Sequence, residues 1–347
     1  MKAIIGWDIG GAHLKLARMN DTGQLIRVAQ HRCPLWQGLP TLEAALETVL
    51  RPEDLDPSVH HAVTMTGELV DAFENRAEGV LAILRTLQGR LGEGPMGIFA
   101  GDLGFLPPEG VGLAHTQHIA SANWLATGLW VGTQLKDAWL IDIGSTTTDI
   151  LPITQGIPRY LGYCDQSRLA AGELVYSGVV RTPLLALTQK APIAGQWIRP
   201  MAEFFATTAD VYRLTGELKE QDDHYPAADG GPKSPAGSAR RLGRQFGVDF
   251  DEATMNQALP LARYLREQQL RRISDALAQV LSRQERPDQA PWVAVGVGRF
   301  LVKDIAQRFD RKQIVLPALL PGDLGAAADC APAAAVAALY RMRHGTA

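Results

Sequence analysis

The hydrophobic and polar positions near the start of the chain alternate in the way that β-strands require. Residues 3–7 are apolar, two glycines follow at a turn, and residues 13–18 alternate between apolar and polar side chains. The sequence Asn-Asp-Thr-Gly at 20–23 is typical of a hairpin turn, so that 24–30 can pair back as a third strand. The pattern therefore predicts a three-stranded antiparallel meander.

Farther along the chain, short apolar runs alternate with longer segments of helical spacing. The pattern predicts strands over 61–66, 96–100, 138–143, 148–153, 292–297 and 314–316. It predicts helices over 41–50, 78–91, 119–135, 260–281 with Pro260 in the first turn, and 326–342 with an interruption at Pro332. Residues 164–250 are less regular, and the Gly- and Pro-rich part at 221–237 is typical of a mobile loop. This order of elements predicts an α/β protein.

One part of the pattern occurs twice. An apolar strand, the sequence Asp-Ile-Gly, a few small residues and a second strand appear around Asp8 and again around Asp142. Such a repeat is weak, but it indicates two related halves rather than one large sheet.

Composition and charge narrow the class of protein. The 347 residues correspond to roughly two domains, with 46% hydrophobic and 20% charged residues, as in a soluble globular protein. Lys and Arg number 34 against 37 Asp and Glu, a formal net charge of -3, which excludes a broadly basic surface for nucleic acid.

The location of the protein is also constrained by its sequence. There is no run of ~18 apolar residues for a membrane helix, and the first residues lack the long apolar region of a signal peptide. Cys33, Cys164 and Cys330 are odd in number and far apart, which fits neither a disulfide framework nor a zinc site. We expect a cytoplasmic protein with reduced thiols and no membrane partner.

The first motif with chemical potential follows the first strand and reads Asp-Ile-Gly-Gly-Ala-His-Leu-Lys over 8–15. Glycines let backbone N–H groups approach an anion, and Asp8 can hold Mg²⁺ directly or through water. Lys15 would bring a positive charge to phosphate oxygens. Taken alone, the motif also fits a plain tight hairpin. The candidate phosphate-binding residues are Gly10, Gly11, Ala12 and His13.

The second motif repeats this arrangement at 142–149 and adds hydroxyl groups, which can donate hydrogen bonds to phosphate oxygens. If the halves are related by an approximate twofold axis, Asp142 faces Asp8, and the two carboxylates repel unless a cation lies between them. Two matching motifs favour a phosphate site with Mg²⁺ on both aspartates. The further candidates are Gly144, Ser145, Thr146 and Thr147 for phosphate, and Lys15 and Asp149 beside the aspartates for catalysis.

The third motif is Gly296-Val297-Gly298-Arg299, directly after a predicted strand. It leaves room for a base, a ribose or another bulky ligand, although an ordinary strand-to-helix turn has the same composition. No third glycine follows, so a Rossmann dinucleotide site is excluded, and the chain has no Walker A loop.

The three motifs, in this order, resemble the ASKHA superfamily of acetate and sugar kinases, heat-shock ATPases and actin. Longer blocks resemble its hydantoinase A/oxoprolinase-related branch: GWDIGGAHLK, VTMTGELVDAF, IFAGD, ASANWLATG and LIDIGSTTTDI. The blocks GELVYSGVVRTP, EFFATTADVYRLTG and GVGRFLV are similar to a short group, the tetrahydromethanopterin-linked C1-transfer proteins of methanofuran-type biosynthesis. The resemblance implies two actin-like (ribonuclease H-like) domains with a cleft between them. It makes residues 296–299 the adenosine-like loop.

That group implies a transferase in which a phenol, on γ-glutamyl-tyramine or a tyrosine-containing analogue, displaces diphosphate from an aminomethylfuran-methyl diphosphate. An ether and free diphosphate result, and Mg²⁺ with two phosphate loops suits this leaving group. The phenol, with a pKa near ~10, needs a base, for which Asp8, Asp142, Asp149 and Asp210 remain alternatives. ATP is not required in this reaction. A kinase or a hydantoinase/oxoprolinase-like ATPase would bind ATP, and a nucleotide-sensing module is a third hypothesis.

Four charged residues of the middle segment are candidates for the substrate cap. Arg168 and Arg181 could bind diphosphate or a glutamyl carboxylate, unless they form ion pairs with Glu173 and Asp210. We expect a first domain over 1–132 with the C-terminal helix 331–347, and a second over 133–330 with an inserted cap at about 164–250. The partners expected are small molecules, and the apolar helix 119–135 is a candidate surface for a homodimer.

Overall fold

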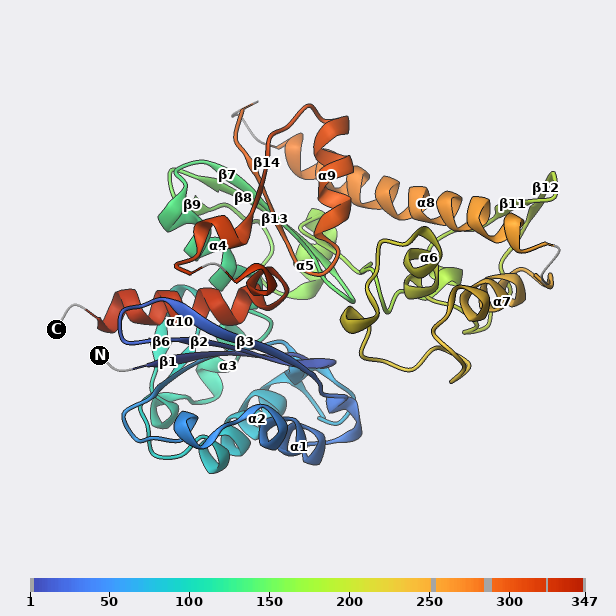
Figure 1. Ribbon diagram of the computed structural model, residues 1–347. Coiled ribbons are helices and arrows are strands. Elements are labelled where there is room, and N and C mark those ends of the chain that lie inside the picture. The colour runs from blue at the N-terminus through green and yellow to red at the C-terminus, as the bar shows by residue number, and fades with distance from the viewer. Residues whose placement is uncertain (1–2, 251–253, 284–288, 323, 346–347) are drawn as a thin grey trace.

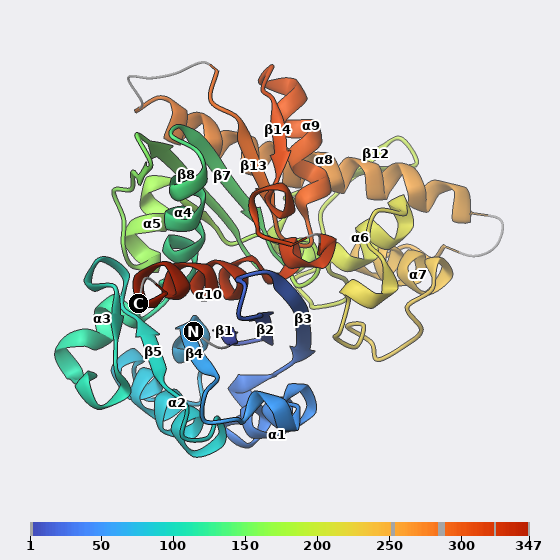
Figure 2. The same ribbon diagram turned by 60° about the vertical axis from the view of Figure 1, so that its left-hand side comes forward.

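Two β-sheets form two lobes of an α/β protein. The structure, a computed structural model, describes residues 3–250, 254–283, 289–322 and 324–345. The C-terminal helix α10 (Ala331–His344) lies between the lobes in both views (Figures 1 and 2). A smaller group of elements, which includes α6 and α7, extends to one side of the second lobe (Figure 1).

The first sheet has the strand order β3-β2-β1-β4-β5-β6. As predicted, β1, β2 and β3 form an antiparallel meander, whereas β4 and β5 run parallel to β1. Residues Ile5, Trp7 and Ile9 of β1 pack with α1 and α2 on one face, and Gly6 lies against α10 on the other. The elements are β1 Ile4–Ile9, β2 His13–Met19, β3 Leu25–Arg32, α1 Pro40–Val49, β4 His60–Met65, α2 Arg76–Arg90, β5 Met96–Phe99 and β6 Phe105–Leu106.

The second sheet repeats the arrangement of the first, with the order β10-β8-β7-β13-β14 and β9 beside β8. The hairpin β7–β8 is antiparallel and β13 is parallel to β7, as β4 is to β1. The prediction of two related halves is therefore confirmed. The elements are α4 Asn123–Gln134, β7 Ala138–Ile143, β8 Thr148–Thr154, β9 Ile157–Pro158, α5 Asp165–Ala171, β10 Leu174–Val175, α8 Met255–Leu281, β13 Trp292–Val295, α9 Arg299–Arg308 and β14 Gln313–Val315.

The elements beside the second lobe have a hydrophobic core of their own, drawn from residues 184–265 and including the first half of α8. They comprise β11 Ala191–Ile193, β12 Gln196–Ile198, α6 Thr208–Thr215 and α7 Pro235–Gln245. The segment 221–237, predicted as a mobile loop, makes defined contacts: Lys233 binds Asp223, and Ser234 caps α7. The domain boundaries given above remain a proposal.

Three predicted helices differ from the observed ones. The helix predicted over 119–135 is two helices, α3 Thr116–Ile119 and α4, separated where Ser121 has a φ of 52°. Helix α8 begins at Met255, so Pro260 lies inside it and removes one backbone hydrogen bond. The interruption at Pro332 is the junction between a 3₁₀ turn over Gly325–Cys330 and the first turn of α10.

The expected dimer surface on the first of these helices is not available. Trp124, Leu125 and Val131 of α4 are buried in the core that α4 shares with α10. An apolar helix therefore indicates here a contact within the chain rather than one between chains. Among the helices in the described ranges, none combines the length and the apolar character needed to span a bilayer.

The close contact between β1 and α10 predicts that one methyl group added at Gly6 lowers the stability of the protein strongly. A Cβ atom added at Gly6 would lie 1.9 Å from the carbonyl oxygen of Ala333, which is backbone and cannot rotate away. We expect Gly6→Ala to lower the free energy of unfolding by about 3 kcal/mol in urea denaturation. The control Gly89→Ala, in α2 with open space around it, should raise that free energy by up to about 1 kcal/mol. Equal stability of Gly6→Ala and the parent would contradict the close packing.

A buried histidine predicts a dependence of stability on pH. The Trp7 indole N–H donates to His61 Nδ1 at 3.1 Å, and burial lowers the pKa of His61 to about 4. Because the unfolded chain takes up this proton from about pH 6.5 downward, this residue makes stability fall between pH 6.5 and 4, by about 3 kcal/mol. Urea unfolding at pH 7 and pH 4.5 measures the fall, which should be smaller in His61→Gln. An identical fall in both proteins would refute this origin.

Candidate active site

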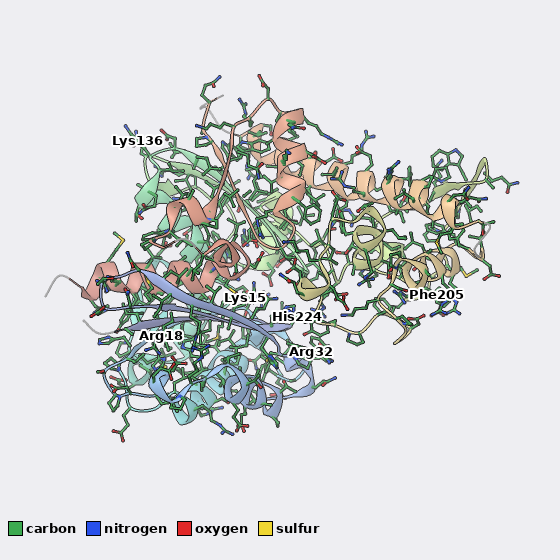
Figure 3. The ribbon with its side chains drawn as sticks, in the orientation of Figure 1. Lys15, Arg18, Arg32, Lys136, Phe205 and His224 are labelled. Carbon is green, nitrogen blue, oxygen red and sulfur yellow. The ribbon has the colours of Figure 1, made fainter. Side chains whose placement is uncertain are left out.

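A cavity of about 510 Å³ opens between the two sheets, where β1 and β7 end. Lys15 and His224 mark the junction between the lobes in Figure 3. Both glycine motifs line this one cavity. Of the residues predicted from the sequence, the cavity is lined by Asp8, Gly10, Gly11, Ala12, His13, Lys15, Asp142, Gly144, Ser145, Thr146, Thr147, Asp149, Arg168 and Arg181.

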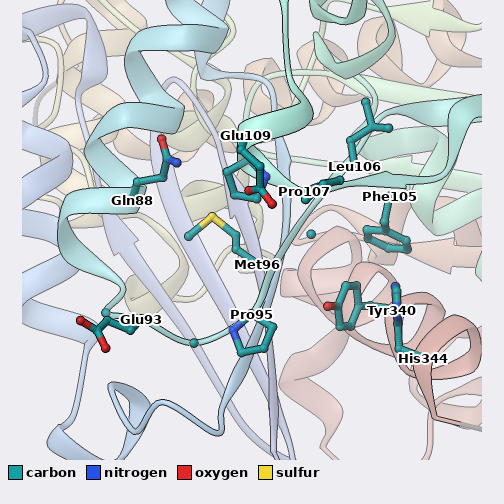
Figure 4. Close-up of a pocket in the computed structure, with 14 residues that line it drawn as sticks. Gln88, Glu93, Pro95, Met96, Phe105, Leu106, Pro107, Glu109, Tyr340 and His344 are labelled. Atoms are coloured by element: carbon teal, nitrogen blue, oxygen red, sulfur yellow. The ribbon is translucent and has the colours of Figure 1, made fainter. Parts of the chain in front are cut away.

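A second hollow, of about 580 Å³, lies at the edge of the first sheet and beside α10 (Figure 4). Met96, Phe105, Tyr340 and His344 line it. It contains none of the residues that the sequence singled out as site residues. The candidate site residues lie instead around the cavity between the sheets.

The two motifs adopt the same backbone turn, which we call the first loop (10–13) and the second loop (144–147). The Gly10 N–H donates to the His13 carbonyl at 2.9 Å, and the Gly144 N–H donates to the Thr147 carbonyl at 2.8 Å. In the strand register, Asp8 lies opposite Lys15 in the first hairpin (β1–β2), and Asp142 lies opposite Asp149 in the second (β7–β8). The repeat in the sequence is thus a repeat in geometry.

The second loop is held by a segment of the middle region. The backbone N–H groups of Val180 and Arg181 donate to the Ser145 carbonyl at 3.1 and 2.9 Å. Gly178 allows this approach, because a Cβ atom there would lie 2.4 Å from the backbone of Ser145 and Thr146. Arg181 also reaches the Thr146 hydroxyl at 3.4 Å, which brings a guanidinium to the second loop.

The first loop is held from the other side by residues 220–233, which we call the strap. The Tyr225 hydroxyl donates to the Ala12 carbonyl, and the Tyr225 ring stacks on Trp36. The Arg181 guanidinium lies over both rings, at 4.9 Å from Trp36 and 5.3 Å from Tyr225. This arginine therefore links the second loop, the strap and the first lobe.

The carboxyl groups of the cavity are crowded and poorly hydrated. Burial raises the pKa of Asp8, an effect opposed by Lys15, whose Nζ lies 3.7 Å from Asp8 Oδ2. Burial, together with the negative charges of Asp149 and Asp8, raises the pKa of Asp142 to about 7. Burial also raises the pKa of Asp149, against the ion pair with Arg168 at 2.7 Å. The folded chain thus stores like-charge repulsion at this point.

These features fit a divalent cation. Asp8 Oδ1 is buried, no hydrogen bond to it is found within the described residues, and Asp142 lines the same cavity. Within the described residues, no group of three or more His, Cys, Asp or Glu side chains converges as a metal site. A cation held by two carboxylates would therefore take its other ligands from water and from the substrate, which is the habit of Mg²⁺.

The four charged residues expected in the substrate cap divide into two pairs. Arg168 lines the cavity with its guanidinium 4.0 Å from the centre of the Trp124 ring, and Arg181 lines it as described above. Glu173 instead accepts hydrogen bonds from two backbone N–H groups and pairs with Arg283 at 3.1 Å. Asp210 is buried in the group of elements that contains α6 and α7, and accepts from Ser238 and Arg241 at 2.8 and 2.9 Å. Asp210 is not placed to act as the base.

The third motif lies behind the cavity rather than on its wall. A Cβ atom at Gly296 would lie 2.4 Å from Asp142 Oδ1, and one at Gly298 would lie 2.4 Å from Ile143. Arg299 donates to the Gly296 carbonyl and pairs with Asp329. Both glycines thus serve the packing of the β13–α9 turn against the end of β7, and an adenosine-like role remains a prediction.

Several residues of the cavity wall were not singled out from the sequence as site residues. Except for Leu174 in strand β10, they lie in or near a helical turn or on an irregular segment, where no periodic pattern indicates a role. Ser121 and Asn123 do stand out as polar residues in an otherwise apolar block, and that was the available signal. The cavity is also lined by Trp36, Thr66, Leu69, Val70, Asp71, Ser121, Asn123, Trp124, Asp165, Leu174, Tyr176 and Pro332.

The comparison with protein families agrees with this geometry. The hydantoinase/oxoprolinase family matches residues 60–342, which is most of the chain. The chain belongs to the hydantoinase/oxoprolinase family. The resemblance predicted from the motifs is therefore confirmed.

Two relatives of this family member are methanogen enzymes. A protein of Methanocaldococcus jannaschii is 28% identical over 308 residues, 88% of this chain and 89% of that protein. It is named as the synthase of a (phenoxymethylfuran-2-yl)methanamine that carries a gamma-L-glutamylaminoethyl group. A protein of Methanococcus vannielii with the same name is 32% identical over 127 residues, 37% of this chain and 57% of that protein. The family member described here is an enzyme.

Among solved structures, the nucleotide-free structure of an acetone carboxylase that works with ATP is similar, with a TM-score of 0.53 and 10% identity. The match covers 87% of this chain and 66% of that chain, and it concerns the fold alone. Together with the repeated hairpin and parallel strands, it confirms two actin-like domains.

Crowding of the carboxyl groups predicts a stabilising substitution. Because the pKa of Asp142 is raised in the folded state, its ionisation weakens folding as the pH rises from about 4 to about 7. In EDTA, Asp142→Asn should increase the free energy of unfolding at pH 8 by up to about 3 kcal/mol, and have little effect at pH 4. Urea denaturation at both pH values measures the difference. A loss of stability at pH 8 would show that the carboxylate is not under repulsion.

Proposed function

We propose that this enzyme is a transferase that joins a phenol oxygen to a furanylmethyl carbon with diphosphate as the leaving group. The observation that carries the proposal is the pair of matching loops, each following an aspartate, on opposite walls of one cavity. The name of the Methanocaldococcus jannaschii relative adds support, since its product contains the phenoxymethyl-furan ether that this reaction forms. The phenol would be that of γ-glutamyl-tyramine or a tyrosine-containing analogue, in methanofuran-type biosynthesis.

The diphosphate would lie between the two loops. Backbone N–H groups at Gly11 and Ala12 and the hydroxyls of Ser145 and Thr146 suit phosphate oxygens from opposite sides. Lys15 and Arg181 bring positive charge to the same place from β2 and from beside the second loop. Charge that develops on the leaving group is thus met by donors already in position.

Asp8 and Asp142 would hold Mg²⁺, which when bound neutralises charge on the diphosphate oxygens. Asp8 can bind through its unpartnered Oδ1 while its other oxygen stays near Lys15. Asp149 is paired with Arg168, so this third carboxylate is balanced within the chain.

Beside the loops, the cavity has walls suited to an aromatic substrate. Leu69, Val70, Trp124, Leu174 and Tyr176 line it from both lobes. The flat rings of Trp124 and Tyr176, with the aliphatic side chains beside them, can position a phenol ring next to the furan carbon and exclude water from it. Exclusion of water matters because hydrolysis would otherwise compete for the activated furan.

The bonds change as follows. A phenol oxygen lone pair forms a bond to the furanylmethyl carbon, and the bond from that carbon to the diphosphate oxygen breaks. The electron pair of that bond leaves with the diphosphate. The furan ring can share positive charge on the carbon, so a modest nucleophile is sufficient. The phenol proton must pass to a base before or during attack.

An ATP-dependent kinase or oxoprolinase-like ATPase was the alternative. That hypothesis relied on the loop at 296–299, and none of its residues lines the cavity. This position favours use of a substrate diphosphate without ATP.

The proposal predicts ether formation and release of diphosphate when the enzyme is mixed with Mg²⁺, the furan diphosphate and the phenol, without ATP. In Asp8→Asn the rate should fall by about 10²- to 10³-fold, because the leaving group loses electrostatic stabilisation. Asp21→Asn, at an exposed aspartate in the turn between β2 and β3, should keep the parent rate. Chromatography of the ether and an assay of diphosphate measure both products. Turnover that requires ATP would sink the proposal.

A further inference from the structure

A buried glutamate next to the cavity has no role in the function described so far. Glu68 belongs to the 3₁₀ turn Gly67–Leu69 after β4, and only 1% of it is exposed. The Ser121 hydroxyl donates to Glu68 Oε1 at 2.8 Å. Glu68 Oε2 is buried and has no hydrogen-bond partner among the described residues. A carboxyl group held in this way has one oxygen oriented by Ser121 and unused capacity for a proton.

Ser121 connects this glutamate to the cavity. It lines the cavity wall, and its hydroxyl is within hydrogen-bond distance of Glu68. Its φ of 52° is uncommon for a residue other than glycine, and it separates α3 from α4. Strained backbone of this kind persists where the surrounding structure requires it, often in a functional site. Here it places a hydroxyl between a buried carboxyl and the substrate space.

The surroundings of Glu68 keep it in place and leave its charge uncompensated. A Cβ atom at Gly79 of α2 would lie 2.5 Å from the Glu68 carbonyl oxygen, so the helix packs directly on this turn. The nearest charged groups are Arg76 on α2 and Asp165 on α5, which pair with each other at 2.7 Å. Burial raises the pKa of Glu68 to about 7, while Ser121 and Arg76 lower it and Asp165 raises it.

The other carboxylates near the cavity are less suited to receive a proton. Asp8 and Asp142 would be occupied by the cation. Of the other three aspartates that line the cavity, Asp149 is paired with Arg168, Asp165 is paired with Arg76, and Asp71 is exposed to solvent. Asp8, Asp142 and Asp149 lie next to the two loops between which the diphosphate would bind, whereas Glu68 reaches the cavity through Ser121, close in sequence to the wall residues Leu69 and Trp124. A base on that side can receive the phenol proton without facing the leaving group.

We propose that Ser121 and Glu68 form a relay that removes the phenol proton, an inference that rests on the proposed function. The phenol O–H bond breaks, its proton passes to Ser121 Oγ, and the Ser121 hydroxyl proton passes to Glu68 Oε1. The phenol oxygen keeps the electron pair and forms the ether bond as diphosphate leaves. After product release, the proton returns through Ser121 to water. Ser121 is then the residue that contacts the substrate, and Glu68 acts through it.

The test compares Glu68→Gln with the parent enzyme across pH 5.5–9. In the parent, kcat/KM should rise with pH through about 7, because the relay requires ionised Glu68. In Glu68→Gln this rise should disappear and the rate should fall by about 10²-fold or more. Glu53→Gln, an exposed glutamate, is the matched control and should keep the parent profile.

A second substrate separates proton removal from structural damage. A nitrophenol analogue that is already ionised at the assay pH needs no base, so the ratio of parent to Glu68→Gln rates should approach one. Ser121→Gly, which suits the left-handed backbone and removes the hydroxyl, should behave in the same way. Thermal unfolding verifies that the variants are folded.

The outcomes distinguish the two proposals. If the parent forms no ether and releases no diphosphate, the proposed function fails. If the parent is active, the relay is overturned by a Glu68→Gln variant with the parent rate and pH profile. It is equally overturned if the same loss appears with the ionised nitrophenol.

Discussion

The desolvation and mutual repulsion of three carboxyl groups that share one cavity are the constraint on which the rest of this structure depends. Asp8, Asp142 and Asp149 meet in one cavity because two hairpins of the same shape end there, one from each sheet. Lys15 and Arg168 offset only part of the negative charge, and the pKa values of all three aspartates are raised. A fold that keeps such an arrangement sacrifices stability for binding, as expected where a cation and a polyanion belong to the function.

Although the backbone of the two hairpins repeats, the two sides of the site carry different charges. Across the hairpins, the position opposite the aspartate is Lys15 in the first lobe and Asp149 in the second. The second lobe compensates with Arg168, which pairs with Asp149 and lies over Trp124 of α4. The symmetry of the backbone thus carries an asymmetric set of charges.

Local pattern was enough to predict much of this fold. The meander, the second hairpin and the two aspartates could be predicted because alternation and turn chemistry are properties of neighbouring residues. The break at Ser121, the packing role of Gly296 and Gly298, and the strap could not, because each depends on residues distant in the chain. Glu68 was missed for the same reason: its environment is made by Ser121, Arg76 and Asp165 from other elements.

The position of α10 has a consequence for the order in which the enzyme is built. This helix leaves the ribosome after both hairpins, and it packs on β1 and α4 and lies between the two sheets. Its Pro332 forms part of the cavity wall. The two hairpins are synthesised at different times, and the cavity between them is complete only after residues 331–344 have joined its wall. A nascent chain therefore has both hairpins before it has the helix that packs between the two sheets.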